Sequence, residues 1–382
     1  ILPPVIDEWI EENPIPQITD KERIKKLFRE ITEKSLRDYP KVLLHDHLDG
    51  GLRPETIISI ANNINYGALP SYDPKDLGKW MLETADQGKL ELYLEAFTHT
   101  IAVMQTEESL FQVAEECVID LDNDGIIYAE IRFAPELFQQ NGLSLDEVVK
   151  AILQGFESGM EGKEVKVKGI LCAMRSNTRS VEIAEVACNF ASKGIVGFDI
   201  AGPEIGYPPL LHSEAFNLAH RNNVPITIHA GEAAGPEFIG EAINTCHASR
   251  VGHGISAIED ISDDGGQIVL GKIASELVHR NIPLEICPTS NIHTGIVDLM
   301  EDHPVNEFLN AGIQVTINTD NRLMSSTCLT NEFLRCQDSF GWGWEGIGSV
   351  TETAITHAFL PQDEKDKLMI RLESWQKSNG II

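Results

Sequence analysis

The sequence contains no apolar run near the roughly 20 residues that a membrane-spanning helix requires, which argues against a helical membrane span. Positive charge is also scarce, because 30 Lys and Arg residues stand against 59 Asp and Glu residues and give a net charge of −29. Nucleic acids and anionic membrane surfaces bind proteins through basic surface. We therefore expect neither nucleic acid nor a membrane as a partner of this chain.

Paired cysteines are missing as well. The seven cysteines are odd in number and scattered, and no CxxC pair occurs, which argues against a thiolate metal site. Cys172 and Cys287 lie inside apolar runs and are predicted to be small core residues. This usage is typical of a reducing compartment, and no secretory signal peptide is visible. We therefore expect a cytoplasmic protein.

The composition that remains, 42% apolar and 23% charged residues in 382 positions, is typical of a globular enzyme. Short apolar runs alternate with helical patterns such as those at 181–190, 271–280 and 305–312. Continuous apolar runs suit strands that are covered on both faces of a parallel sheet. Repeated alternation of this kind predicts an α/β fold, a (β/α)8 TIM-type barrel. The strands are predicted at 41–45, 126–133, 166–174, 195–202, 225–231, 249–254, 283–288 and 314–320.

Two parts of the chain are predicted to be additions to this barrel. Residues 1–39 are read as an N-terminal helical extension packed on the outside, with an amphipathic helix over 21–36 that Thr19 and Asp20 cap. The barrel domain itself is predicted to span 40–382. The gap of about eighty residues after its first strand has room for extra helices, and we expect these to form a lid over the barrel mouth. The last stretch, 342–382, is read as terminal helices that close the barrel.

Four short motifs, HDHLDG, HAGE, GHG and NTDN, follow predicted strands and supply candidate metal ligands. His45 and His47 are two residues apart, so on an extended backbone both imidazoles point the same way. His229 ends the fifth predicted strand and Asp320 ends the eighth. Because the carboxyl ends of barrel strands meet on one face, these four side chains are expected to converge. Imidazoles and a carboxylate with one open position predict a catalytic Zn²⁺ site, with one ion per chain.

Two further residues are candidates for proton transfer. Glu232 lies three residues after His229, and a carboxyl group beside a metal-activated water can act as general acid or base if its pKa is raised. His253 is flanked by Gly252 and Gly254, and we expect these glycines to allow close approach of a substrate. Taken singly, each of these residues also has an ordinary structural interpretation, as a buried histidine, a helix cap or a turn. The metal-site hypothesis rests on their joint occurrence at strand ends.

At this level of detail the sequence resembles the adenosine deaminase family of zinc-dependent amidohydrolases. The segments PKVLLHDHLDGGLRPETI, IIYAEIRFAPE, GILCAMR, LEICPTSN and NTDN are similar to family segments in family order, over roughly residues 40–335. The resemblance implies hydrolytic deamination of adenosine and 2′-deoxyadenosine to inosine and ammonia, in purine salvage. The zinc ligands that it implies are His45, His47, His229 and Asp320.

The resemblance also implies roles at the purine. Glu232 is expected to be protonated and to donate to N1, while His253 and Asp320 orient the attacking hydroxide. Asp49 is expected to accept a hydrogen bond from the ribose 5′-hydroxyl, and His47 also lies at the substrate. The backbone N–H of Gly202 is expected to contact N3.

One position departs from the family pattern. The residue after the metal-binding aspartate is Asn321 where an aspartate is common, at the position that contacts purine N7. A carboxyl group must be protonated to donate there, whereas an amide donates at any pH, so we expect activity to survive. The carboxylate of Asp49 favours a nucleoside over a 5′-nucleotide. Two alternatives remain, a deaminase of adenine or of a modified adenine nucleoside, and a barrel that binds nucleosides without turning them over. The sequence gives no oligomeric state.

Overall fold

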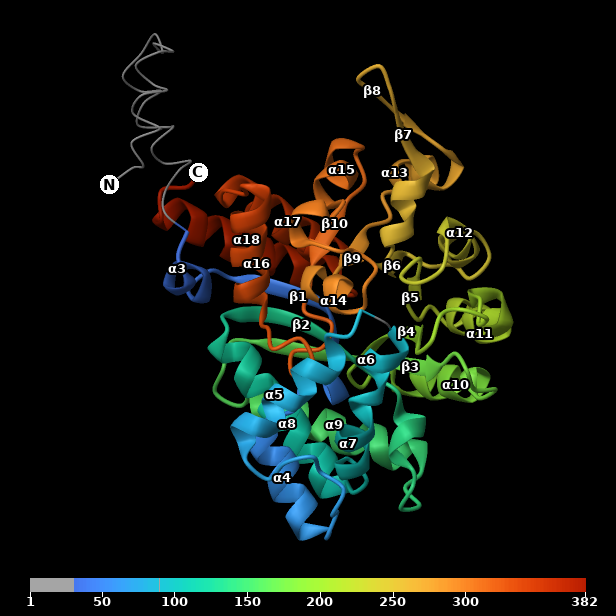
Figure 1. The fold of residues 1–382 in the computed structure, drawn as a ribbon, viewed down its shortest axis with the longest axis vertical. Helices are drawn as coiled ribbons and strands as arrows, with labels where there is room; N and C mark the ends of the chain where they lie inside the picture. The colour runs from blue at the N-terminus through green and yellow to red at the C-terminus, as the bar shows by residue number, and fades with distance from the viewer. Residues whose placement is uncertain (1–30, 89) are drawn as a thin grey trace.

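Eight parallel strands form a (β/α)8 barrel in the computed structural model, which describes residues 31–88 and 90–382 (Figure 1). They pair as two four-stranded sheets, in the orders β1-β2-β3-β4 and β10-β9-β6-β5. Isolated parallel bridges from Phe198 to Ile226 and from Asp46 to Asp320 join the two sheets at both seams, so the eight strands follow one another around the barrel. The strands are β1 (Lys41–His47), β2 (Ile126–Phe133), β3 (Lys166–Met174), β4 (Ile195–Ala201), β5 (Thr227–Ala230), β6 (Arg250–His253), β9 (Leu284–Ile286) and β10 (Val315–Ile317).

The continuous apolar runs of the sequence are explained by this arrangement. Every residue of β2 is buried, as expected of a parallel strand between a packed barrel interior and a ring of outer helices. The predicted helices at 181–190, 271–280 and 305–312 are present as α10, α13 and α15. The helices that follow β2 to β10 in the chain are α9 (Leu145–Met160), α10 (Ser180–Phe190), α11 (Ser213–Arg221), α12 (Pro236–Asn244), α13 (Lys272–Arg280), α14 (Pro288–His293), α15 (Val305–Asn310) and α16 (Leu329–Phe340).

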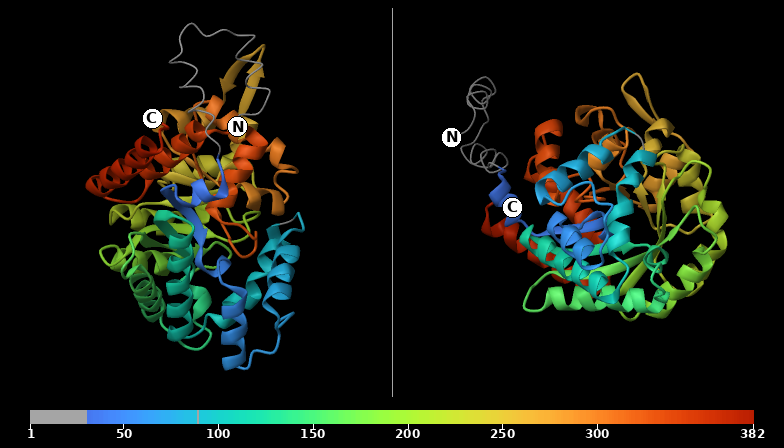
Figure 2. Two further views of the ribbon diagram at one scale, coloured as in Figure 1. Left: turned by 90° about the vertical axis from the view of Figure 1, so that its left-hand side faces the viewer. Right: turned by 60° about the horizontal axis from the view of Figure 1, so that its bottom comes forward.

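The predicted extra helices after the first strand are also present. They are α4 (Pro54–Asn63), α5 (Pro74–Ala85), α6 (Leu90–Glu95), α7 (Phe97–Val103) and α8 (Glu107–Asn123). The side chains of Leu90, Tyr93 and Phe97, from α6 and α7, line the cavity at the carboxyl ends of the barrel strands. In the right-hand view of Figure 2 these cyan helices lie across the barrel. They cover the mouth in the place where the sequence predicts a lid.

The N-terminal helix predicted over 21–36 lies mostly outside the described residues. In the described part, Thr32 is extended, with φ −127° and ψ 160°, and its side chain accepts a hydrogen bond from the backbone of Ser35. This capping contact starts a separate short helix, α3 (Glu33–Arg37), so a continuous helix through residue 36 is wrong. At the other end, α17 (Trp344–His357) and α18 (Gln362–Ser378) complete the barrel wall as expected. The ring of Tyr39 packs against Trp375 with ring centroids 4.9 Å apart.

One element is not predicted by the sequence. An antiparallel hairpin of β7 (Ile261–Asp264) and β8 (Gln267–Leu270) follows β6 and projects from the body of the protein (Figure 1). Its turn is made by Gly265 and Gly266, both at positive φ. Among the described helices, none combines the length and apolar character that crossing a bilayer requires.

Candidate active site

The structure brings the predicted metal ligands together at the carboxyl ends of the strands. Nε2 of His47 lies 3.2 Å from Nε2 of His229 and 3.4 Å from Oδ1 of Asp320. Nε2 of His45 lies 3.5 Å from the same carboxylate oxygen. His45 and His47 lie on β1, and His229 lies on β5. Asp320 follows β10 and forms the isolated parallel bridge to Asp46 of β1. Residues nearly 280 positions apart in the sequence thus share one site because the barrel closes there.

The strand ends adopt backbone conformations that turn side chains into this site. His253 and Asp320 have φ of 59° and 57°, in the left-handed region that is costly for residues other than glycine. Such strain persists only where surrounding contacts hold it. At Asp320, one such contact is the backbone N–H, which donates to the carbonyl of His45 at 3.0 Å. A second is the carbonyl of Asp320, which accepts the backbone N–H of His47 at 2.7 Å.

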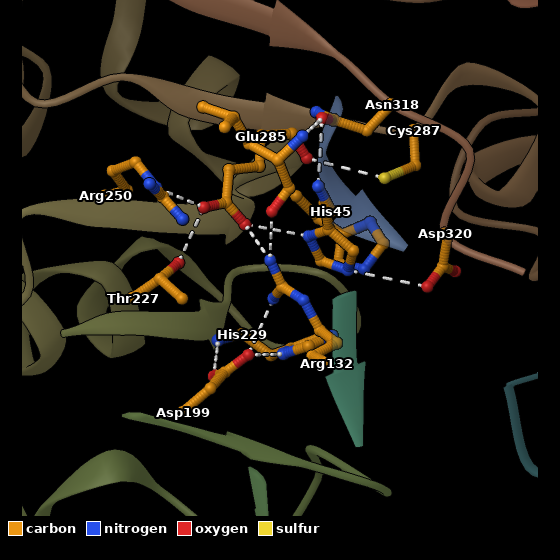
Figure 3. Close-up of polar contacts among 12 residues, drawn as sticks. His45, Arg132, Asp199, Thr227, His229, Arg250, Glu285, Cys287, Asn318 and Asp320 are labelled. Atoms are coloured by element: carbon orange, nitrogen blue, oxygen red, sulfur yellow. Dashed lines mark hydrogen bonds and ion pairs between the residues drawn. The ribbon is translucent and has the colours of Figure 1, made fainter. Parts of the chain in front are cut away.

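Two buried carboxylates hold the far nitrogens of the metal-site histidines (Figure 3). Nδ1 of His45 contacts Oε2 of Glu285 at 2.9 Å, and Nδ1 of His229 contacts Oδ2 of Asp199 at 2.8 Å. If each Nδ1 carries the proton and donates it to the carboxylate, each Nε2 presents a lone pair to the site. This carboxylate–imidazole arrangement is the usual support of a metal-binding histidine.

Arg132 connects the two carboxylates. Its guanidinium is fully buried and donates to Asp199 at 2.6 Å and to Glu285 at 2.8 Å, as Figure 3 shows. A third bond reaches the carbonyl of Leu44 at 2.8 Å, directly before His45. Burial alone would raise the pKa of both carboxyl groups, but the neighbouring charges, Arg132 prominent among them, hold both well below their usual range. The two supporting carboxylates therefore remain ionised.

The donor set fits a metal ion. Nε2 of His45 and Nε2 of His253 are buried without a hydrogen-bond partner, which is costly unless a ligand satisfies them. Burial lowers the pKa of His47 and of His229, so these imidazoles are neutral at pH 7 and offer a lone pair. Nitrogen and carboxylate donors of this kind suit Zn²⁺ and similar divalent cations.

His253 and His47 are both candidates for the fourth metal ligand beside His45, His229 and Asp320. Donor atoms of His45, His229, His253 and Asp320 all lie within 4.8 Å of one another, a group that omits His47. The direct distances of 3.2 and 3.4 Å nevertheless place His47 within the same cluster. Nδ1 of His253 contacts the amide of Asn291 at 3.1 Å, while its Nε2 lies 3.8 Å from Oε1 of Glu232. His253 thus faces the candidate acid, whereas His47 faces His229 and Asp320.

The glycines around His253 have a packing role that the sequence did not predict. A Cβ atom at Gly252 would lie 3.1 Å from Cε1 of the His45 ring and 3.4 Å from Cγ of His229. Gly254 has φ of 70°, and a Cβ there would lie 2.6 Å from the side chain of Leu284. These glycines allow the rings of His45 and His229 and the side chain of Leu284 to pack against the backbone.

Glu232 lies where the sequence predicts, in the turn after β5 and beside the predicted metal ligands. Its carboxyl group is buried, and burial together with the charges of Asp320 and Glu204 raises its pKa well above the usual range. A carboxyl group that stays protonated at neutral pH can donate a proton or a hydrogen bond. Asp320 is different: burial alone would raise its pKa, but the surrounding histidines hold it well below the usual range. Its second oxygen accepts from Ser290 at 2.6 Å.

A cavity of ≈ 160 Å³ opens over these groups. His47, Glu232 and Asp320 line its floor, and apolar side chains of α6 and α7 line its cover. Three larger hollows in the described part of the chain, of ≈ 540, ≈ 400 and ≈ 210 Å³, contain none of the predicted site residues. Because the predicted site residues line the cavity of ≈ 160 Å³, that cavity is the candidate active site.

The predicted substrate contacts line the same cavity. Asp49, Gly202 and Asn321 are all present in its wall. Burial raises the pKa of Asp49 to about 7. Gly202 has φ of 99°, a conformation that favours glycine. Oδ1 of Asn321 is buried without a hydrogen-bond partner, and a Cβ atom at Gly50 would lie 1.9 Å from it, so Gly50 leaves the room that this amide occupies.

Three residues behind the histidines, Arg132, Asp199 and Glu285, are absent from the predicted site residues. A signal existed, because each is a charged residue inside a run otherwise predicted to be a buried strand. Charged side chains are seldom fully buried unless they are paired or bind an ion. Glu204 was missed as well, and it lies in a loop with no such contrast around it.

Comparisons of sequence and of structure show which known proteins this chain resembles. A family model described as adenosine deaminase matches residues 40–375. A protein named adenosine deaminase from Mycobacterium marinum is 48% identical over 340 residues, which cover 87% of this chain and 94% of that protein. The crystal structure of adenine deaminase from Arthrobacter aurescens is 25% identical with a TM-score of 0.78, covering 89% of this chain and 99% of that one. An amidohydrolase from Burkholderia ambifaria, solved with bound zinc, is 18% identical with a TM-score of 0.78, covering 93% and 97% of the two chains.

Proposed function

The chain belongs to the adenosine deaminase family, its reaction is the hydrolytic deamination of adenosine, and we propose that it performs this reaction with one zinc ion per chain. The ligands that we assign to zinc are His45, His47, His229 and Asp320. The observation that carries this assignment is the cluster of Nε2 atoms and a carboxylate oxygen at 3.2 to 3.5 Å, with the far nitrogens of two histidines tied to buried carboxylates. Zinc, when bound, supplies hydroxide near neutral pH by lowering the pKa of water to roughly 7.

The protein residues supply proton transfer and orientation. Glu232, held protonated by burial, donates a proton to purine N1 as hydroxide adds to C6. His253 and Asp320 hold the proton of the attacking water. That proton passes to the amino group, which leaves as ammonia. The proton of the new C6 hydroxyl group returns to the Glu232 carboxylate, and inosine remains. The buried, lid-covered cavity strengthens these electrostatic contacts because it excludes bulk water.

The substrate is proposed to be a nucleoside, adenosine or 2′-deoxyadenosine. Asp49 accepts the 5′-hydroxyl, the Gly202 N–H contacts N3, and the Asn321 amide contacts N7. His47 lines the cavity beside the ligand as well as binding the metal. The strongly acidic composition supports a small molecule rather than nucleic acid or a membrane surface as the partner.

Deamination of the free base adenine is the second candidate, and the 25% identity to an adenine deaminase over nearly the whole of that structure favours it. A barrel that binds nucleosides without turnover is disfavoured, because the acid and the donor set are all in place. A role in purine salvage follows from the reaction, since inosine feeds the recovery of purine bases.

The surroundings of the enzyme are also part of the proposal. All seven cysteines are free, which agrees with a reducing cytoplasm. We place a helical extension at 1–39, of which only residues 31–39 are described, and the barrel domain at 40–382. The side chain of Leu36, at the end of this extension, is fully buried, which supports its packing on the barrel.

The test is ultraviolet absorbance of zinc-loaded protein with adenosine, 2′-deoxyadenosine, adenine and AMP in parallel. We expect rapid conversion of both nucleosides, abolished by a chelator and restored by zinc. Turnover of adenine or AMP with none of adenosine would keep the site but overturn the assignment of Asp49 and Asn321. Binding of adenosine without release of ammonia would overturn the catalytic proposal altogether.

A further inference from the structure

Glu204 makes an unusual set of contacts with the turn that carries the candidate acid. It lies in the loop after β4 and is 1% exposed. Its Oε1 accepts the backbone N–H of Gly231 at 2.7 Å. Its Oε2 accepts the N–H groups of Glu232, Ala233 and Ala234 at 3.0, 2.6 and 2.8 Å. One carboxylate thus satisfies four successive backbone donors.

Four successive amides can point at one acceptor only if the chain forms a concave turn. Gly231 provides it with φ of 71°, and a Cβ atom there would lie 2.5 Å from Oγ of Ser256. Such a concave run of N–H groups is a binding site for negative charge, and charge-assisted bonds are about twice as strong as neutral ones. The Glu204 carboxylate is therefore well placed to fix this turn.

The Glu232 carboxyl group depends on that turn. Within residues 31–88 and 90–382 it forms no hydrogen bond to another protein group, and its Oε1 lies 3.8 Å from Nε2 of His253. Its position is consequently set by its own backbone rather than by a side-chain partner. The backbone N–H of Glu232 is one of the four that Glu204 holds.

We propose that Glu204 is a positioning residue for the reaction, which fixes the Gly231–Ala234 turn and thereby aims the Glu232 carboxyl group at the substrate. The inference rests on the proposed role of Glu232 as the proton donor. It assigns to Glu204 no contact with substrate or metal. Accurate positioning of a reacting group raises the turnover rate, because a misplacement of about 1 Å can lower turnover on the order of 100-fold.

The first test is Glu204→Gln, an isosteric change that replaces one acceptor oxygen by an NH₂ group facing backbone donors. We expect kcat for adenosine to fall roughly 10- to 100-fold, while KM changes less than about 3-fold and the metal content stays the same. The matched control is Glu130→Gln. Glu130 is also fully buried and also accepts a backbone N–H, from Phe359 at 2.5 Å, but it lies outside the cavity. The control should lose stability while keeping kcat.

A double-mutant cycle separates positioning from a merely structural role. In the background of Glu232→Gln, adding Glu204→Gln should lower kcat by less than about 3-fold, because the group that Glu204 aims is already gone. Full additivity of the two losses would overturn the proposal, and so would a Glu204→Gln enzyme that keeps the parent kcat.

A measurement on the parent protein covers the case in which Glu204→Gln does not fold. Amide hydrogen exchange of residues 231–234 should be strongly slowed in the metal-loaded enzyme. Exchange at the rate of an open loop would overturn the proposal. An enzyme with protected amides and no turnover of adenosine would instead count against the proposed function, so the two failures are distinguishable.

Discussion

Replacing Arg132 with methionine is expected to weaken metal binding without removing any metal ligand. The substitution keeps an unbranched apolar stem but deletes three buried contacts, with Asp199 at 2.6 Å, Glu285 at 2.8 Å and the Leu44 carbonyl at 2.8 Å. The two carboxylates that orient His45 and His229 would lose their shared cation. Each would then be free to rotate or to take up a proton.

The magnitude follows from these contacts. Removing one partner of a buried ion pair costs about 3–5 kcal/mol of folding stability. For a domain of this size that loss corresponds to a fall in Tm of roughly 4–7 °C. Loss of a supporting contact to a metal-binding histidine typically costs about 10- to 100-fold in metal affinity. We therefore expect weaker zinc binding in that range, measured by competition with a chromogenic chelator.

Arg250→Met is the matched control. Arg250 is also fully buried and also forms two ion pairs, with Glu130 and Glu285 at 2.6 Å each, plus one bond to a backbone carbonyl. It binds Oε1 of Glu285, whereas Arg132 and His45 share Oε2. The two variants should therefore lose similar stability, but Arg132→Met should lose more metal affinity. Equal losses of metal affinity would refute the idea that Arg132 acts through the histidine-bound oxygens.

Three further predictions concern the substrate contacts and pH. Asp49→Ala should raise KM for adenosine roughly 10- to 100-fold, since a hydrogen bond to a charged group contributes about 1.5–3 kcal/mol. The same substitution should leave any turnover of adenine unchanged, and equal effects on both substrates would contradict the assignment of Asp49 to the ribose. Asn321→Asp should make kcat/KM fall as pH rises, because a carboxyl group donates only when protonated, and a profile parallel to that of the parent would remove support for a donor at N7. Burial lowers the pKa of His303 to about 4, so the folded protein binds fewer protons than the unfolded chain between about pH 6.5 and 4, and stability falls as pH falls through this window. His303→Gln should remove up to about 3 kcal/mol of that acid sensitivity, as judged by urea unfolding at pH 7 and pH 4.5; an unchanged difference between the two pH values would be evidence against it.

Much of the site could be read from the sequence because its signals are local. The pair His45 and His47 shows its common direction through spacing alone, since alternate residues of a strand face the same side. His229 and Asp320 could be added because parallel barrel strands end on one face, whatever their separation along the chain. The strand–helix alternation likewise predicts the barrel, and buried parallel strands such as β2 leave an unbroken apolar signature.

The tertiary structure decided what spacing cannot express. Arg132, Asp199 and Glu285 occur on three different strands, and only closure of the barrel makes them one network behind the metal-site histidines. The four backbone bonds of Glu204 depend on the shape of a distant turn, which no side-chain pattern records. Local periodicity reports which face of an element is buried, whereas the partner of a buried charge is fixed by how elements pack. The sequence by itself therefore determined the fold and predicted which side chains meet at the strand ends, and the packing of the barrel decided how those side chains are held.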